Sequence, residues 1–161
     1  MGETSNLPDL GAQVRPLIQA LPAGIQPCLM ARLERAAADR YQTWAALCPE
    51  PAKAEGLRAC ALREQEVAKR VEALSPSQPD EGRYLSDALP RIAEAYRAGL
   101  ANRSINDQYA IQAAAERRGA AFWRSLASSF TDVPVREAPG MCADLEERSA
   151  EFLVALLAEN P

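Results

Sequence analysis

The chain has 161 residues and a formal net charge of −4, from 18 Lys and Arg against 22 Asp and Glu, with four Cys and no His. Without imidazole, it offers no Ser-His-Asp or Cys-His nucleophile pair, no histidine general base and no histidine metal ligand. The length fits one domain with its own core, and 48% hydrophobic with 25% charged residues is ordinary for a globular protein.

Partners and location follow from how charge and hydrophobicity are distributed. The basic residues are scattered among Asp and Glu and form no run, which argues against nucleic acid as a partner. No apolar stretch is long enough to span a membrane, and residues 1–8 lack the basic and apolar regions of a secretion signal. The cysteines form no C-x-x-C pair. We therefore expect a cytoplasmic protein with reduced thiols and no membrane partner.

The predicted elements are all helical, because Ala, Leu, Glu, Arg and Gln dominate and no segment alternates apolar with polar residues as a strand does. Residues 1–24 are an N-terminal lead with a short helix expected near residues 14–20, and residues 25–161 form the main domain. Further helices are predicted at about 25–47, 51–74, 81–101, 104–129 and 141–159. Pro90 is expected to kink or break its helix, and Pro139-Gly140 to form a turn.

Four main helices with one long middle connection predict a four-helix bundle with a crossover. Its helix pairs are residues 25–74 and 104–159, and the connection is residues 75–103, which carries an extra helical segment. An offset of 82 residues superimposes the first pair on the second, so that Glu34 matches Glu116 and Glu64 matches Glu146. The chain thus contains a candidate internal repeat that singles out four acidic residues.

These glutamates are expected to point into the bundle, since the residues three and four positions away on both sides are mostly apolar. The polar exceptions are Gln112, beside Glu116, and Ser149, beside Glu146. A lone buried carboxylate is costly. Each must therefore be protonated, paired with Arg or Tyr, or bound to a cation. The candidate metal ligands are Glu34, Glu64, Glu116 and Glu146.

One inward Glu on each of four helices resembles the ferritin-like superfamily, and the local sequence is most similar to its rubrerythrin branch. Residues 34–41, Glu-Arg-Ala-Ala-Ala-Asp-Arg-Tyr, resemble the first ligand helix of that family, and residues 63–68, Arg-Glu-Gln-Glu-Val-Ala, resemble its Glu-x-x-His-Ala segment. Residues 116–123 and 145–150 repeat this pair. The resemblance implies a ferritin-like four-helix bundle built from two pseudo-repeated helix pairs.

The chain departs from that family at the two histidine ligands of its di-iron site. Val67 and Ser149 stand at these positions. The resemblance therefore implies a degenerate member of the family, with a centre that has carboxylate ligands only.

Two functions remain open. The first is a non-catalytic, degenerate ferritin-like bundle without a cofactor, which acts as a binding or assembly module and self-associates, with a homodimer favoured. The alternative is a carboxylate-only metal-binding protein or metal-dependent oxidoreductase that holds Mn, Fe, Mg or Ca through the four glutamates, with Tyr41 as a redox participant. No catalytic residue is assigned, and the protein partner is not identified.

Two other groups of residues have a functional and a structural interpretation. Cys60 and Cys142 are either a redox pair or, more simply, buried inert thiols. The aromatic residues are either the lining of a small-molecule or radical-transfer site or, at their helical spacing, core; they are Tyr41, Trp44, Phe122 and Trp123.

Overall fold

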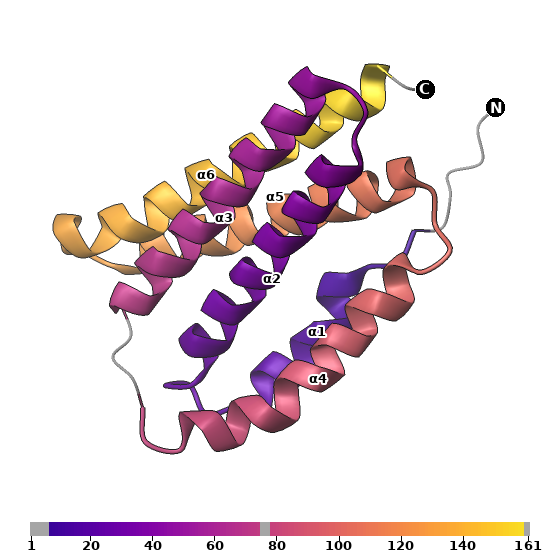
Figure 1. Ribbon diagram of the computed structural model, residues 1–161. Helices are drawn as coiled ribbons and strands as arrows, with labels where there is room; N and C mark the ends of the chain where they lie inside the picture. Colours follow the sequence, from indigo (N-terminus) through magenta and orange to yellow (C-terminus); the bar gives the residue numbers. More distant parts are fainter. Residues whose placement is uncertain (1–6, 75–77, 160–161) are drawn as a thin grey trace.

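A computed structural model describes residues 7–74 and 78–159, and these ranges contain helices and connections but no strand. The prediction of an all-α protein is therefore confirmed. In chain order (Figure 1) the helices are α1 (Leu10–Gln19), α2 (Gln26–Leu47), α3 (Pro51–Leu74), α4 (Glu81–Leu100), α5 (Ile105–Ser129) and α6 (Val133–Glu159). None of the described helices is both long and apolar enough to cross a lipid bilayer.

Local sequence signals account for several helix starts. The Asp9 side chain accepts a hydrogen bond of 2.8 Å from the backbone N–H of Ala12 and caps α1. At the start of α5, the Ser104 hydroxyl accepts a bond of 3.1 Å from the N–H of Asp107. Proline opens α2 and α3, where its missing N–H removes no helical hydrogen bond.

Two helices contain prolines where the sequence predicted an interruption. The prediction of a Pro139-Gly140 turn was wrong, because α6 begins at Val133 and runs through Pro139. A break at Pro90 was also wrong, because α4 continues through this residue, while a kink there stays a prediction. An internal proline costs a helix about 3 kcal/mol. Pro139 is fully buried, so its packing offsets this loss, while α4 keeps an apolar face that holds it against α1.

The long helices pack in two pairs: α2 lies along α3, and α5 lies along α6, while α3 also contacts α6. By contrast, the backbones of α2 and α5 lie farther apart in the described part of the chain, and large side chains such as Trp44 and Tyr109 meet between them. Helices α1 and α4 lie side by side, and α1 contacts both α2 and α5 (Figure 1). One side of the four-helix arrangement is therefore covered by α1 and α4.

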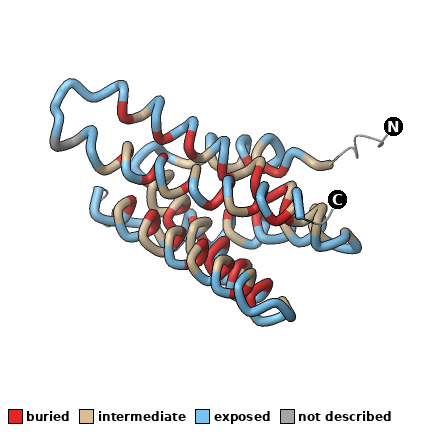
Figure 2. The backbone as a smooth tube through the Cα atoms, turned by 90° about the horizontal axis from the view of Figure 1, so that it is seen from above, coloured by how far each residue is buried: buried red, intermediate tan, exposed pale blue. Residues whose placement is uncertain are grey.

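Buried residues line the facing sides of the helices (Figure 2), and two apolar clusters fill the interior between α2, α3, α5 and α6. The first cluster includes Tyr41 and Leu57, and the second includes Val67 and Trp123. On α3, Glu64 lies between a member of each cluster. A polar layer thus interrupts the core halfway along the helices.

Candidate metal centre

The polar layer consists of the four glutamates singled out by the sequence, one each from α2, α3, α5 and α6. Glu64, Glu116 and Glu146 are buried, with exposed fractions of 0%, 2% and 3%. Glu34 is partly exposed, because it borders a cavity. The expectation that all four point inward is therefore confirmed, with Glu34 the one that still meets solvent.

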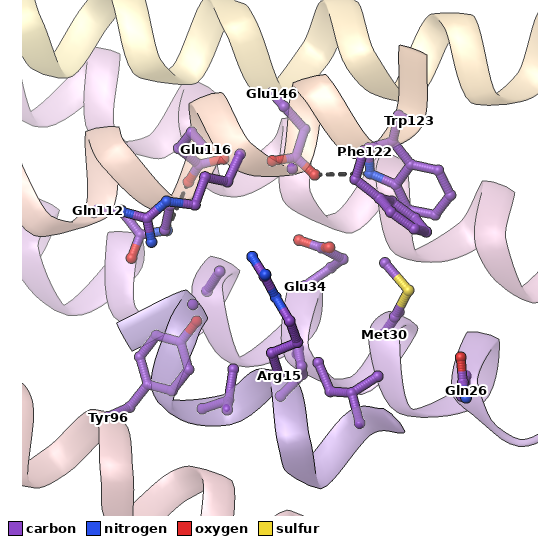
Figure 3. A pocket seen from close by; sticks show the side chains of 18 of the residues that line it. Arg15, Gln26, Met30, Glu34, Tyr96, Gln112, Glu116, Phe122, Trp123 and Glu146 are labelled. Carbon is purple, nitrogen blue, oxygen red and sulfur yellow. Dashed lines mark hydrogen bonds between the residues drawn. The ribbon is translucent and has the colours of Figure 1, made fainter. Parts of the chain in front are cut away.

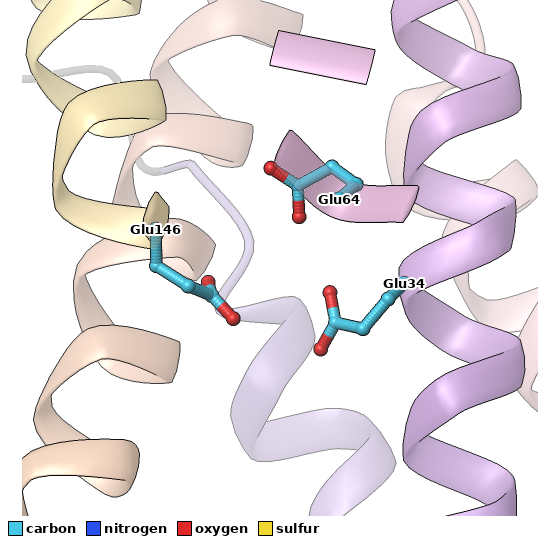
Figure 4. A group of neighbouring side chains, drawn as sticks. All are labelled: Glu34, Glu64 and Glu146. Atoms are coloured by element: carbon cyan, nitrogen blue, oxygen red, sulfur yellow. The ribbon is translucent and has the colours of Figure 1, made fainter. Parts of the chain in front are cut away.

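Three of the four carboxyl groups form one close group (Figure 4). Glu34, Glu64 and Glu146 each contribute an oxygen atom, and these atoms lie within 4.8 Å of one another. Glu116 does not belong to this group. The structure thus divides the predicted set of four into three plus one.

Hydrogen bonds explain why Glu116 stands apart. Its Oε1 atom accepts a bond of 2.8 Å from the Tyr41 hydroxyl and another of 2.6 Å from Nε2 of Gln112. Gln112 in turn accepts a bond of 3.1 Å from Nε of Arg40. This chain of donors connects Glu116 to Tyr41 on α2 and to Gln112 on its own helix.

The group of three has fewer donors. Glu64 Oε1 accepts a bond of 2.9 Å from the Ser149 hydroxyl, and Glu146 Oε1 accepts one of 3.0 Å from the indole N–H of Trp123. The second oxygen of Glu64, Oε2, is buried and has no hydrogen-bond donor. A buried acceptor without a partner is uncommon in folded proteins and marks a place where a ligand or proton belongs.

Gly119 makes room for this arrangement. A Cβ atom at position 119 would collide with Oε2 and with the carboxyl carbon of Glu146. The side chain of Glu146 therefore occupies space on the α5 surface that any other residue would fill. Gly119 sits inside α5, where glycine weakens a helix by about 1 kcal/mol relative to alanine.

Burial dominates the electrostatics of the centre. It raises the pKa of Glu34 to about 8, with a further contribution from the negative charge of Glu116. Burial also raises the pKa of Glu64 and Glu146 well above the ordinary value, and the neighbouring carboxylates act in the same direction. The four glutamates form no ion pair with a described Lys or Arg. The positive charge of Arg40 lowers the pKa of Glu34 and Glu116, but it does not overcome burial. Protons or a cation must therefore balance the remaining charge.

The donor set contains oxygen only. Val67 is fully buried in an apolar cluster, and Ser149 donates to Glu64 instead of offering a nitrogen ligand. A di-iron site of the resembling family needs two histidine ligands. The residues present do not fit such a site, but carboxylate oxygens suit hard divalent ions.

A cavity of about 400 Å³ adjoins the centre (Figure 3). It is lined by residues of α1, α2, α4, α5 and α6, and it reaches the side chains of Glu34, Glu116 and Glu146. Sequence reasoning did not reveal it, because the cavity depends on where α1 lies.

The thiols match the simpler interpretation. Cys60 and Cys142 are free and buried, and burial raises the pKa of Cys60 to about 12 and that of Cys142 to about 11. Thiols with raised pKa values are poor nucleophiles at neutral pH. Arg63 donates a bond of 3.2 Å to the Cys60 sulfur, but its charge does not overcome the effect of burial.

The four aromatic residues fall into a buried group and one exposed residue. Tyr41, Trp44 and Trp123 are buried as expected for core residues, yet Tyr41 and Trp123 also donate to the glutamates. Phe122 is 46% exposed and lines the cavity, so a core position for it was wrong. The internal repeat, which aligns Tyr41 with Trp123, was the signal that could have marked both as donors.

Comparison of the chain with models of known protein families, with curated proteins and with solved structures found no match.

Proposed function

We propose that the protein binds a single divalent cation through the carboxylates of Glu34, Glu64 and Glu146, in a bundle of the ferritin-like type. The observation that carries this proposal is Oε2 of Glu64, a buried acceptor without a donor in a group of three carboxyl groups. A divalent cation would satisfy this atom and neutralise carboxylates that form no ion pair with a described Lys or Arg. Binding is the proposed function, and no catalytic step is assigned.

The spacing of the oxygens supports a single ion. Opposite ligands of Ca²⁺ lie about 5 Å apart, which is twice a metal–oxygen distance of about 2.4 Å. The three oxygen atoms lie within 4.8 Å of one another, so small side-chain movements suffice to enclose an ion. All-oxygen ligation favours Mn²⁺, Mg²⁺ or Ca²⁺, and Fe²⁺ as a softer alternative.

The test is equilibrium dialysis of chelator-treated protein against Mn²⁺ near pH 8, with metal content measured per chain. We expect one Mn²⁺ per chain in the wild type and its loss in Glu64→Gln, which keeps the shape of the side chain. The matched control is Glu66→Gln, since Glu66 lies two residues away and pairs with Arg70 near the surface. Circular dichroism spectra establish that both variants are folded.

Two outcomes would contradict this function. Wild-type protein without bound Mn²⁺ at saturating concentration is the first, and Mn²⁺ binding that Glu64→Gln leaves unchanged is the second. Either result would favour the non-catalytic binding or assembly module, for which self-association as a homodimer remains the prediction.

A further inference from the structure

We infer that the cavity beside the metal centre binds an organic carboxylate with an apolar body, whose carboxylate group lies between the bound cation and Arg15. This inference rests on the proposed metal function and adds the chemical class of a ligand. It is carried by the position of the cavity, by one unpaired arginine and by an apolar wall.

The cavity brings a ligand next to the cation. Its volume of about 400 Å³ falls within the range of small-molecule sites, roughly 300–1,000 Å³. Glu34 is both a member of the carboxylate group and a cavity-lining residue, and it is the one member that is partly exposed. The open side of the metal centre therefore faces the cavity, where a ligand oxygen could reach the ion.

Arg15 is the cation available to an anionic ligand. Three arginines line the cavity, of which Arg40 donates to Gln112 and lies 4.9 Å from the ring centre of Tyr96, and Arg118 pairs with Asp9. Arg15 forms no ion pair or hydrogen bond with any residue that the structure describes. Figure 3 shows its side chain projecting from α1 into the cavity, toward Glu34.

The remaining wall is apolar. Met30, Phe122 and Trp123 lie together on one side of the cavity (Figure 3). The rings of Phe122 and Trp123 pack edge to face, with 5.0 Å between the ring centres. Phe122 is 46% exposed. An apolar ligand body would cover this exposed ring, and removing such area from water is favourable by about 25 cal/mol per Å².

The charges favour a carboxylate over an amine. A carboxylate can accept two parallel hydrogen bonds from a guanidinium group and is also a good ligand for a hard cation. An ammonium group would face the like charge of Arg15 and would compete with the metal for the same glutamates. The two ligand classes are therefore expected to differ in whether they need the metal.

The experiment measures how protein-bound Mn²⁺ relaxes the proton resonances of hexanoate, hexylamine and hexanol in solution. We expect hexanoate to bind the Mn²⁺-loaded protein, with the strongest broadening at the methylene next to the carboxylate. Arg15→Gln should weaken hexanoate binding roughly tenfold or more, the scale for one lost charge-assisted hydrogen bond, and should leave Mn²⁺ stoichiometry unchanged. Arg117→Gln is the matched control, because Arg117 is exposed and lies on α5 outside the cavity.

The outcomes separate this inference from the metal function. If the protein binds Mn²⁺ but hexanoate does not bind, or binds equally well to Arg15→Gln, the ligand class is wrong and the metal function stands. If hexylamine binds and Mn²⁺ displaces it, the ligand class would be an amine and the carboxylate proposal would be wrong. Equal binding of hexanol would show that only the apolar wall matters. If no Mn²⁺ binds, both proposals fail together.

Discussion

The hydroxyl of Ser149 on α6 donates a hydrogen bond of 2.9 Å to Oε1 of Glu64 on α3, and it leaves Oε2 of the same carboxyl group without a donor. Ser149 stands where the resembling ferritin-like proteins would place a histidine ligand. In the proposed metal site the serine would therefore orient a ligand instead of being one. Hydrogen bonds of this kind fix the direction of a metal ligand and tune its affinity.

Replacing Ser149 with alanine should weaken cation binding without abolishing it. The variant leaves Oε1 of Glu64 buried without its donor, so we expect Mn²⁺ affinity to fall by about tenfold or more. The free energy of unfolding of the metal-free protein should fall by about 1–3 kcal/mol. Urea unfolding and Mn²⁺ titration measure the two effects. Ser128→Ala, at an exposed position near the end of α5, should change neither, and unchanged affinity in Ser149→Ala would contradict the orienting role.

The stability of the metal-free protein should decrease as pH rises from about 4.5 to about 8. A carboxyl group whose pKa is higher in the folded protein holds its proton there after the unfolded chain has released it. Its contribution to stability is complete below the unfolded pKa and is lost as pH rises through the folded value, which for Glu34 is about 8. Each such group lowers the free energy of unfolding by about 1.4 kcal/mol for each pH unit across this window.

Urea unfolding with a chelator at several values between pH 5 and pH 8 tests this dependence. Glu34→Gln should make the free energy of unfolding fall less steeply with pH, because the amide does not titrate. Glu72→Gln should leave the slope unchanged, because Glu72 pairs with Arg35 at the surface. Mn²⁺ should restore stability most at the alkaline end, where protons no longer compete for the carboxylates. A free energy of unfolding that rises over this range would count against the buried, uncompensated cluster.

Helical spacing was enough to predict that Glu34, Glu64, Glu116 and Glu146 share the interior, because a period of 3.6 residues defines a face without tertiary information. It was not enough to predict that only three of the four carboxyl groups lie close together. Glu116 leaves the close group because Tyr41 and Gln112 donate to it, and which donors meet which acceptor depends on the separation of α2 and α5. That separation is set by packing between distant segments.

The sequence rule that proline interrupts a helix failed at Pro139, where the side chain is buried. Pro139 was predicted to form a turn with Gly140 ahead of the last helix, but it is fully buried inside α6, and its contacts outweigh one lost hydrogen bond. Phe122 and Arg15 could not be placed from the sequence either. Both line a cavity that exists because α1 contacts both α2 and α5, and no local pattern in α1 specifies that position.

Gly119→Ala should remove cation binding by steric means. The added Cβ would occupy the space of the Glu146 carboxyl group, so that Oε2 must move away from Glu34 and Glu64. We expect Mn²⁺ affinity to fall strongly and the clash to cancel the gain of about 1 kcal/mol that alanine brings to a helix. Gly82→Ala, on α4 with open space around it, is the control and should be neutral or stabilising. Full Mn²⁺ binding by Gly119→Ala would show that Glu146 is not a ligand.

Glu116→Gln distinguishes a centre of one ion from a centre of two. The amide can still accept the bond from Tyr41, and Glu116 lies outside the close group, so one Mn²⁺ per chain should remain bound. Glu146→Gln removes a member of the group and should abolish binding, while its neighbour Glu147→Gln, which pairs with Arg124, should not. Metal analysis together with the Mn²⁺ resonance spectrum gives the count. Two coupled ions in the wild type, with both lost in Glu116→Gln, would replace the single-ion centre with a dinuclear one bridged by all four carboxylates.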